Sequence, residues 1–236
     1  MKKIFYSADS RGYADHGWLE ARHSFSFANY YDPERIHFGM LRVLNDDIIA
    51  PAEGFGTHPH NNMEIITIPL SGQLEHKDNM GNGSVITAGE VQVMSAGTGV
   101  MHSEFNPSGT EHANLLQIWI FPEKKDVNPR YDQRRFKHEV FHNNIRTIVN
   151  NNENDNSLFI YQKAVISMAR VTAGREMEYL LHYPGHGVYF FLIDGKILID
   201  ESVLLRRDAM GITETSDIPF RALEDSHILL LEVPMT

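Results

Sequence analysis

Two histidines, His58 and His60, stand on either side of Pro59 in the segment GFGTHPHNNMEI. Residues two apart on an extended strand project from the same face, so both imidazoles would lie close together. Such a pair suits a single divalent metal ion. The same residues could equally be polar surface decoration near a turn, because short motifs also arise by chance. Taken alone, the pair leaves both interpretations open.

A second pair with the same spacing, His102 and Glu104, occurs in the segment SAGTGVMHSEF. Each pair would occupy one face of a strand, and two neighbouring antiparallel strands could bring both pairs to one point. Three imidazoles and one carboxylate suit iron(II), manganese, nickel, copper or zinc, and they leave coordination positions open for a substrate or dioxygen. The two pairs together predict a metal site.

Glu64 is a second carboxylate that lies close to these histidines in the sequence. On a straight strand, four residues of about 3.3 Å rise would place it roughly 13 Å beyond His60, out of reach of a shared ion. A turn at Asn61 and Asn62 would remove that objection, whereas Glu104 needs no turn to accompany His102. The residues alone therefore leave two candidates for the carboxylate ligand.

Strands are the elements that must position these residues, because helix signals are scarce. Short apolar runs recur between Gly, Pro, Asn and Asp residues, among them FGMLRVLN, MEIITIPL, VQVMSA, LLQIWIF, VYFFLI and HILLLEV. Many short strands with such punctuation predict an all-β sandwich or barrel. The best helical candidate is a turn at residues 32–35.

The chain reads as two β units. The polar segment 122–136 contains two prolines and predicts a connection, which gives a first domain at residues 1–125 and a second at 126–236. Segments 68–94 and 190–213 share a rhythm of strands and glycine turns, which indicates a duplicated barrel. A polar stretch at residues 150–158 predicts an exposed loop in the second unit.

Composition narrows the class of protein. The net charge of -10 argues against nucleic-acid binding, which needs clustered Lys and Arg. The absence of cysteine excludes thiolate metal sites and disulfides. The amino terminus lacks the apolar region of a secretory signal, and no apolar run approaches the roughly 20 residues that a membrane span needs. We therefore expect a cytoplasmic protein without a membrane partner.

Three segments carry a family resemblance. The segment GFGTHPH, followed by Glu64 and Gly72, resembles the first cupin motif, and the stretch from Gly89 through SAGTGVMHSE resembles the second. Together with HSFSFANYYDP near the amino terminus, they resemble the pirin family. The resemblance implies two tandem cupin barrels of the double-stranded β-helix, or jelly-roll, type. It also implies a relationship to the bacterial pirins that act as quercetin 2,3-dioxygenases.

The resemblance also implies a ligand set. In pirins the ligands are the two histidines of the first motif and the His and Glu of the second, which here are His58, His60, His102 and Glu104. Glu64 would then orient an imidazole from behind. We expect one divalent transition metal per chain, with Fe(II) as the first choice and Ni, Cu, Mn, Co or Zn as alternatives, held in the first barrel. The second barrel, which lacks both His-x-His and His-x-Glu, would be free of metal.

Two functions follow as hypotheses. The first is a metal-dependent dioxygenase that cleaves a flavonol such as quercetin with dioxygen, with Glu104 as the catalytic base. The alternative is a non-enzymatic regulator that docks on a partner protein according to its metal or redox state. A closed apolar cavity above the metal would favour the enzyme, and a solvent-open metal would favour the regulator. His76 and His112, which lack a histidine or glutamate two residues away, are expected at the surface or in hydrogen bonds.

Overall fold

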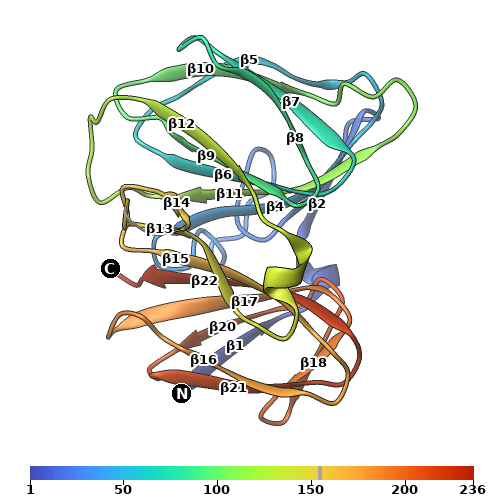
Figure 1. Cartoon of the computed structure of the whole chain (residues 1–236), viewed down its shortest axis with the longest axis vertical. Coiled ribbons are helices and arrows are strands. Elements are labelled where there is room, and N and C mark those ends of the chain that lie inside the picture. The colour runs from blue at the N-terminus through green and yellow to red at the C-terminus, as the bar shows by residue number, and fades with distance from the viewer. Residues whose placement is uncertain (154–155) are drawn as a thin grey trace.

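The structure, a computed structural model, describes residues 1–153 and 156–236. Figure 1 shows two β-barrels, one above the other, each made from a seven-stranded sheet and a four-stranded sheet. The two larger sheets face each other in the middle, and the smaller sheets close the barrels on the outside. The predicted all-β architecture of two barrels is confirmed. The loop predicted at 150–158 includes residues 154 and 155, which lie outside the described residues.

The first barrel contains the histidine motifs. Its larger sheet has the order β12-β9-β6-β11-β4-β3-β2, and its smaller sheet has the order β5-β10-β7-β8. The larger sheet is built from β2 (Gly12–Asp15), β3 (Leu19–His23), β4 (Leu41–Ile49), β6 (Glu64–Ser71), β9 (Glu90–Ser95), β11 (Ala113–Ile120) and β12 (Arg130–Arg135). The smaller sheet is built from β5 (Gly54–His60), β7 (Gln73–Asp78), β8 (Gly83–Thr87) and β10 (Val100–Phe105).

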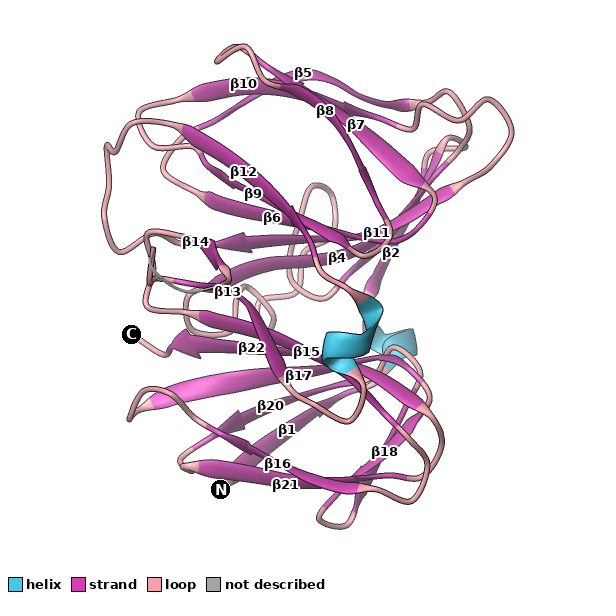
Figure 2. Cartoon of the chain, viewed as in Figure 1, coloured by secondary structure: helices cyan, strands magenta, loops and turns pink. Residues whose placement is uncertain are grey.

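The second barrel repeats this plan. Its larger sheet contains β1 (Lys2–Tyr6), β13 (Arg146–Asn150), β14 (Leu158–Phe159), β15 (Val165–Val171), β17 (His186–Asp194), β20 (Ala209–Thr213) and β22 (Ser226–Pro234). Its smaller sheet contains β16 (Glu176–Leu180), β18 (Lys196–Ile199), β19 (Ser202–Leu205) and β21 (Asp217–Ala222). Two short 3₁₀ helices, η1 (Ala8–Ser10) and η2 (His138–Phe141), lie beside the junction of the barrels (Figure 2). No helix among the described residues is long and apolar enough to cross a membrane.

One strand from each side of the predicted boundary at residue 125 belongs to the sheet of the other barrel. Strand β1 pairs antiparallel with β20 and therefore belongs to the sheet of the second barrel. The segment expected as a connection, 122–136, contains strand β12, which pairs with β9 and extends the sheet of the first barrel. The segment at residues 32–35 forms a turn and no helix. The boundary at residue 125 stays a prediction, and the sheets do not follow it strictly.

The two barrels share one apolar core. Leu44, Ile66 and Ile118 of the first large sheet belong to the same buried cluster as Ile166 and Leu229 of the second. These side chains come from strands that alternate between faces, so each large sheet presents one apolar face to the other. Burial of this surface from water stabilises the stacked arrangement.

The barrel interiors differ in chemistry. The first barrel buries polar side chains from several strands, including Thr67, His76, Gln92 and Gln117. The second is filled by an apolar cluster that includes Phe190 and its neighbours on β17, β20 and β22. Because buried polar groups are costly unless they find partners, a polar barrel interior indicates a binding site rather than a packed core.

Candidate metal centre

Strands β5 and β10 bring the three predicted histidine ligands together. In their antiparallel register, His102 lies opposite His58 and Val100 lies opposite His60. The ring centroids of His58 and His102 are 4.4 Å apart, and those of His60 and His102 are 4.9 Å apart. One ring nitrogen from each histidine lies within 4.8 Å of the others. The convergence that the spacing predicts is therefore present for the imidazoles.

Glu104 lies beside this triad without being part of it. Its carboxylate forms a second group with His76 and His102, again within 4.8 Å, so the two groups share His102. Gln117 donates a hydrogen bond to Glu104 from Nε2 at 2.9 Å, and Thr67 donates from Oγ1 at 3.5 Å. Burial outweighs these bonds and raises the pKa of the Glu104 carboxyl to about 7. The four residues proposed as ligands thus form two overlapping clusters.

The histidines have the protonation that a cation requires. Burial and the neighbouring imidazoles lower the pKa of His102 to about 2, and burial with His58 lowers the pKa of His60 to about 4. The Nδ1 atom of His58 forms a hydrogen bond of 2.8 Å with the carbonyl oxygen of Gly56. A carbonyl only accepts, so Nδ1 carries the proton and Nε2 keeps a lone pair for a ligand. The neutral rings of His60 and His102, and the Nε2 of His58 that faces away from its Nδ1–H bond, fit a divalent transition metal.

His76 positions His102 from behind. Its Nε2 lies 3.1 Å from Oδ2 of Asp78, and its Nδ1 lies 3.4 Å from Nδ1 of His102. Because the carboxylate accepts, Nε2 of His76 donates, and Nδ1 of His76 can accept from Nδ1 of His102. Nε2 of His102 is then left with its lone pair, and this atom is buried without a hydrogen-bond partner among the described residues. An orphaned buried nitrogen at this position is what a metal ion would satisfy.

The surface position considered for His76 is wrong, and the hydrogen-bonding role is correct. His76 is fully buried and stacks on Tyr131 with ring centroids 4.7 Å apart. The missed signal was the spacing of His76 and Asp78, which share a strand face as His102 and Glu104 do. His112 is exposed, as expected.

Glu64 occupies a different position from the one expected. It is buried at the start of β6, accepts a hydrogen bond from Oγ of Ser95 at 2.7 Å, and also accepts one from the backbone N–H of Tyr161 in the second barrel. No hydrogen bond joins it to an imidazole among the residues that the structure describes. The turn after His60 leads β6 into the opposite sheet of the barrel, so Glu64 contacts the other barrel and does not back a ligand.

Aromatic side chains flank the histidines. Trp119 packs edge-on against His60 with ring centroids 4.8 Å apart, and Phe27 packs edge-on against Trp119 at 5.3 Å. From the sequence, Phe25, Phe27, Phe38 and Trp119 could belong to the core or to a substrate wall. Phe25 and Phe38 lie in the core between the barrels, whereas Phe27 and Trp119 lie beside the site.

Two stacked β-barrels, with histidines and a carboxylate clustered inside the first, define a bicupin of the metal-binding kind. Comparison with known families agrees. Residues 6–120 match the Pirin family, and residues 147–233 match the family described as the quercetinase C-terminal cupin domain.

Several relatives are similar over nearly the whole chain. The chain is 41% identical over 227 residues to the quercetin 2,3-dioxygenase of Escherichia coli K12. The alignment covers 96% of each chain. It is 40% identical over 225 residues to a pirin-like protein of Caulobacter vibrioides, covering 95% of this chain and 96% of the relative. A crystal structure of the E. coli bacterial pirin YhhW in complex with nickel(II) superposes with a TM-score of 0.94 at 39% identity and full coverage of both chains. The chain belongs to the pirin family.

Proposed function

We propose that this protein is a metal-dependent dioxygenase that cleaves a flavonol such as quercetin. One divalent transition metal per chain, with Fe(II) as the first expectation, would be held by His58, His60, His102 and Glu104. The observation behind the proposal is the convergence of three imidazole nitrogens within 4.8 Å, beside a buried carboxylate that shares His102. The names of the relatives and the nickel(II) complex of one of them support it. The metal would bring the flavonol oxygen and dioxygen together.

Glu104 is the residue of this chain that can move a proton. Deprotonation of the flavonol 3-hydroxyl needs an acceptor whose pKa lies near the working pH. Burial favours the protonated form of Glu104, which suits it to take up a proton, and the bond from Gln117 fixes one carboxylate oxygen. An oxygen of Glu104 would receive the hydroxyl proton.

The aromatic neighbours favour the enzyme over the regulator. A flat flavonol ring can pack against Trp119 and Phe27, beside the histidines. The indole N–H of Trp119 is buried without an acceptor among the described residues, which leaves it available to a substrate oxygen. Such surroundings suit an aromatic small molecule.

A turnover assay tests this function. The purified chain, loaded separately with Fe(II) and with Ni(II), is mixed with quercetin in air while flavonol absorbance and dissolved dioxygen are followed together. We expect both to fall in a fixed ratio, and a flavone without the 3-hydroxyl to be inert. His58→Ala and His102→Ala should abolish turnover, whereas the exposed His112→Ala should leave it unchanged. Metal-loaded protein that leaves quercetin untouched would refute the proposal and favour the regulator.

A further inference from the structure

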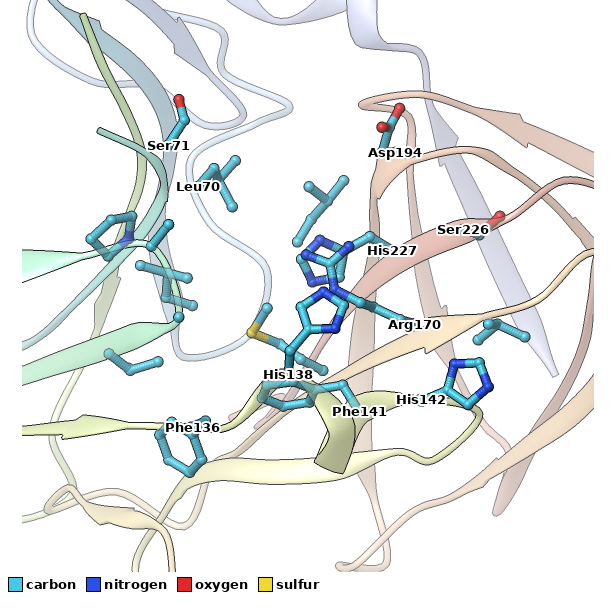
Figure 3. Close-up of a pocket in the computed structure, with 18 of the residues that line it drawn as sticks. Leu70, Ser71, Phe136, His138, Phe141, His142, Arg170, Asp194, Ser226 and His227 are labelled. Carbon is cyan, nitrogen blue, oxygen red and sulfur yellow. The ribbon is translucent and has the colours of Figure 1, made fainter. Parts of the chain in front are cut away.

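A cavity of about 810 Å³ opens between the two barrels, apart from the metal centre. Its walls come from the end of β6, from η2 and from β15 and β22, and they include no residue of the two ligand clusters. Figure 3 shows Arg170, His138 and His227 gathered in this cavity. A volume of this size lies within the range of small-molecule sites.

The lining of this cavity is basic in an acidic protein. Five arginines and lysines face it against three carboxylates, whereas the whole chain has a net charge of -10. Three histidines line it as well. A local excess of positive charge with low-dielectric walls attracts anions.

Some of these cations have ion-pair partners at short range, whereas Arg170 has only the more distant charge of Asp194. Arg207 is held by Asp46 at 2.7 Å, and Arg135 lies 3.3 Å from Glu90. The half-buried guanidinium of Arg170 makes no side-chain hydrogen bond and no ion pair within 4.0 Å among the described residues. Five fixed N–H donors on a planar group are therefore free to bind an oxyanion.

His227 offers a second unsatisfied polar atom in the same place. Its Nε2 is buried and has no hydrogen-bond partner among the residues described by the structure. Burial, together with the charges of Arg170, Arg207 and His138, lowers the pKa of His227 to about 3. The neutral ring can still donate one N–H to an anion.

Apolar side chains form the remainder of the cavity. Leu70 comes from the first barrel, Phe136 follows strand β12, and Phe141 ends η2. Figure 3 places Leu70 and Phe136 on the side away from Asp194 and Ser226. A ligand that fills this space would need an apolar body in addition to its charge.

We propose that the cavity between the barrels binds a small organic anion. Its carboxylate or phosphate group sits on Arg170 and His227, and its apolar body packs against Leu70 and Phe136. This site is separate from the metal centre, and its existence does not depend on the proposed dioxygenase reaction.

Calorimetric titration of the full chain tests the proposal, with phenyl phosphate and 3-phenylpropionate as probes. We expect saturable binding of one molecule per chain by at least one probe, and weaker binding of inorganic phosphate. Arg170→Met should weaken binding about 10-fold or more, the loss typical of one hydrogen bond to a charged group. Arg221→Met removes the same charge at an exposed position of strand β21, outside the cavity, and should leave the affinity unchanged.

Further variants separate lost contacts from lost folding. Arg170→Lys should keep part of the affinity, and His227→Phe should weaken binding while both variants retain the parent circular dichroism spectrum. His58→Ala should bind the probes like the parent, because the metal centre is remote from the cavity. Absence of saturable binding by both probes, equal affinity for inorganic phosphate, or equal losses in Arg170→Met and Arg221→Met would each overturn the proposal.

Discussion

At the scale of single residues, the two buried glutamates of the first barrel show how neighbours decide a role. Glu104 faces His76 and His102 inside the barrel, and Glu64 bonds to Ser95 and to the backbone of Tyr161. Burial raises the pKa of each carboxyl to about 7. The two carboxyls thus have similar pKa values, and only their neighbours distinguish a candidate metal ligand, Glu104, from a contact between the barrels, Glu64.

Substitution of these two glutamates should separate metal binding from stability. Glu104→Ala removes the anionic ligand, so we expect loss of most bound metal, measured by elemental analysis after dialysis. Glu64→Ala should keep metal but lower the free energy of unfolding by about 1–3 kcal/mol, because Ser95 and the Tyr161 N–H lose a buried acceptor. Metal loss on removing Glu64 together with retention on removing Glu104 would reverse the ligand assignment.

Metal binding should weaken as the pH falls below neutrality. The Glu104 carboxyl, whose pKa is about 7 in the metal-free chain, must release its proton to serve as a ligand. Apparent affinity should therefore drop roughly tenfold per pH unit between pH 7 and pH 5. His60, whose pKa is about 4, should compete only below that range. Competition with a chelator of known affinity measures the slope, which should flatten in Glu104→Gln.

The raised pKa values of Glu64 and Glu104 also make the stability of the metal-free chain depend on pH. A carboxyl whose folded pKa is raised from 4.5 to about 7 binds more protons folded than unfolded between those values. Stability must then fall as the pH rises through that window. Thermal unfolding of the metal-free protein should therefore show a higher midpoint at pH 5 than at pH 7.5, as far as these two groups are concerned, and added metal should stabilise more at the higher pH.

At the scale of elements, the close pairing of β5 with β10 holds the histidines in register. The ladder shifts between His102 and Glu104, where β5 carries one extra residue, as in a β-bulge. At Gly54 the two backbones approach so closely that an added Cβ would lie 2.2 Å from the carbonyl oxygen of Glu104. A glycine at that position is needed for space.

Two glycines of β5 provide a matched test of this pairing. Gly54→Ala should push β5 away from β10, lower the free energy of unfolding by about 1–3 kcal/mol and weaken metal binding, because the histidine pair moves with the strand. Gly56→Ala meets no atom within 4 Å and should change neither property beyond experimental error. Thermal unfolding and metal titration of both variants measure the difference, and equal behaviour would show that the close approach does not matter.

Sequence predicts best what strand alternation decides locally. The placement of His58 with His60 and of His102 with Glu104 on common strand faces needs only a two-residue period, so spacing alone predicts both pairs. The stacking of Tyr131 on His76 and the edge-on packing of Trp119 against His60 depend on which strands become neighbours, so spacing could not reveal them. The expected role of Glu64 behind an imidazole came from the family resemblance, and its contacts with Ser95 and Tyr161 also depend on which strands and barrels become neighbours.

At the scale of the whole molecule, one arginine joins the two barrels. Arg207, between β19 and β20, donates to Asp46 of β4 at 2.7 Å and to Asn114 of β11 at 3.1 Å. Both members of the ion pair are nearly buried. Removing one member of such a pair leaves an uncompensated charge, which is costly.

Neighbouring arginines allow a direct comparison of this link. Arg207→Met should lower the free energy of unfolding by about 3 kcal/mol, because Asp46 stays nearly buried and keeps only the more distant Arg11, at 3.7 Å, as an ion-pair partner beside its hydrogen bond from Asn114. Arg206→Met removes an exposed charge that lies 3.5 Å from Asp194 and should cost at most about 1 kcal/mol. Urea unfolding at one pH measures both, and similar costs would mean that the link contributes little.

The crossing of β1 into the second barrel sets the order in which the molecule can be completed. Lys2 lies opposite Thr213, so this strand is synthesised long before its partner exists. Its backbone must wait unpaired while the first barrel forms, and pairings so distant in sequence close slowly. The strand that is made first is therefore among the last to be paired. Strand β1 can join the second barrel only after β20 has been synthesised.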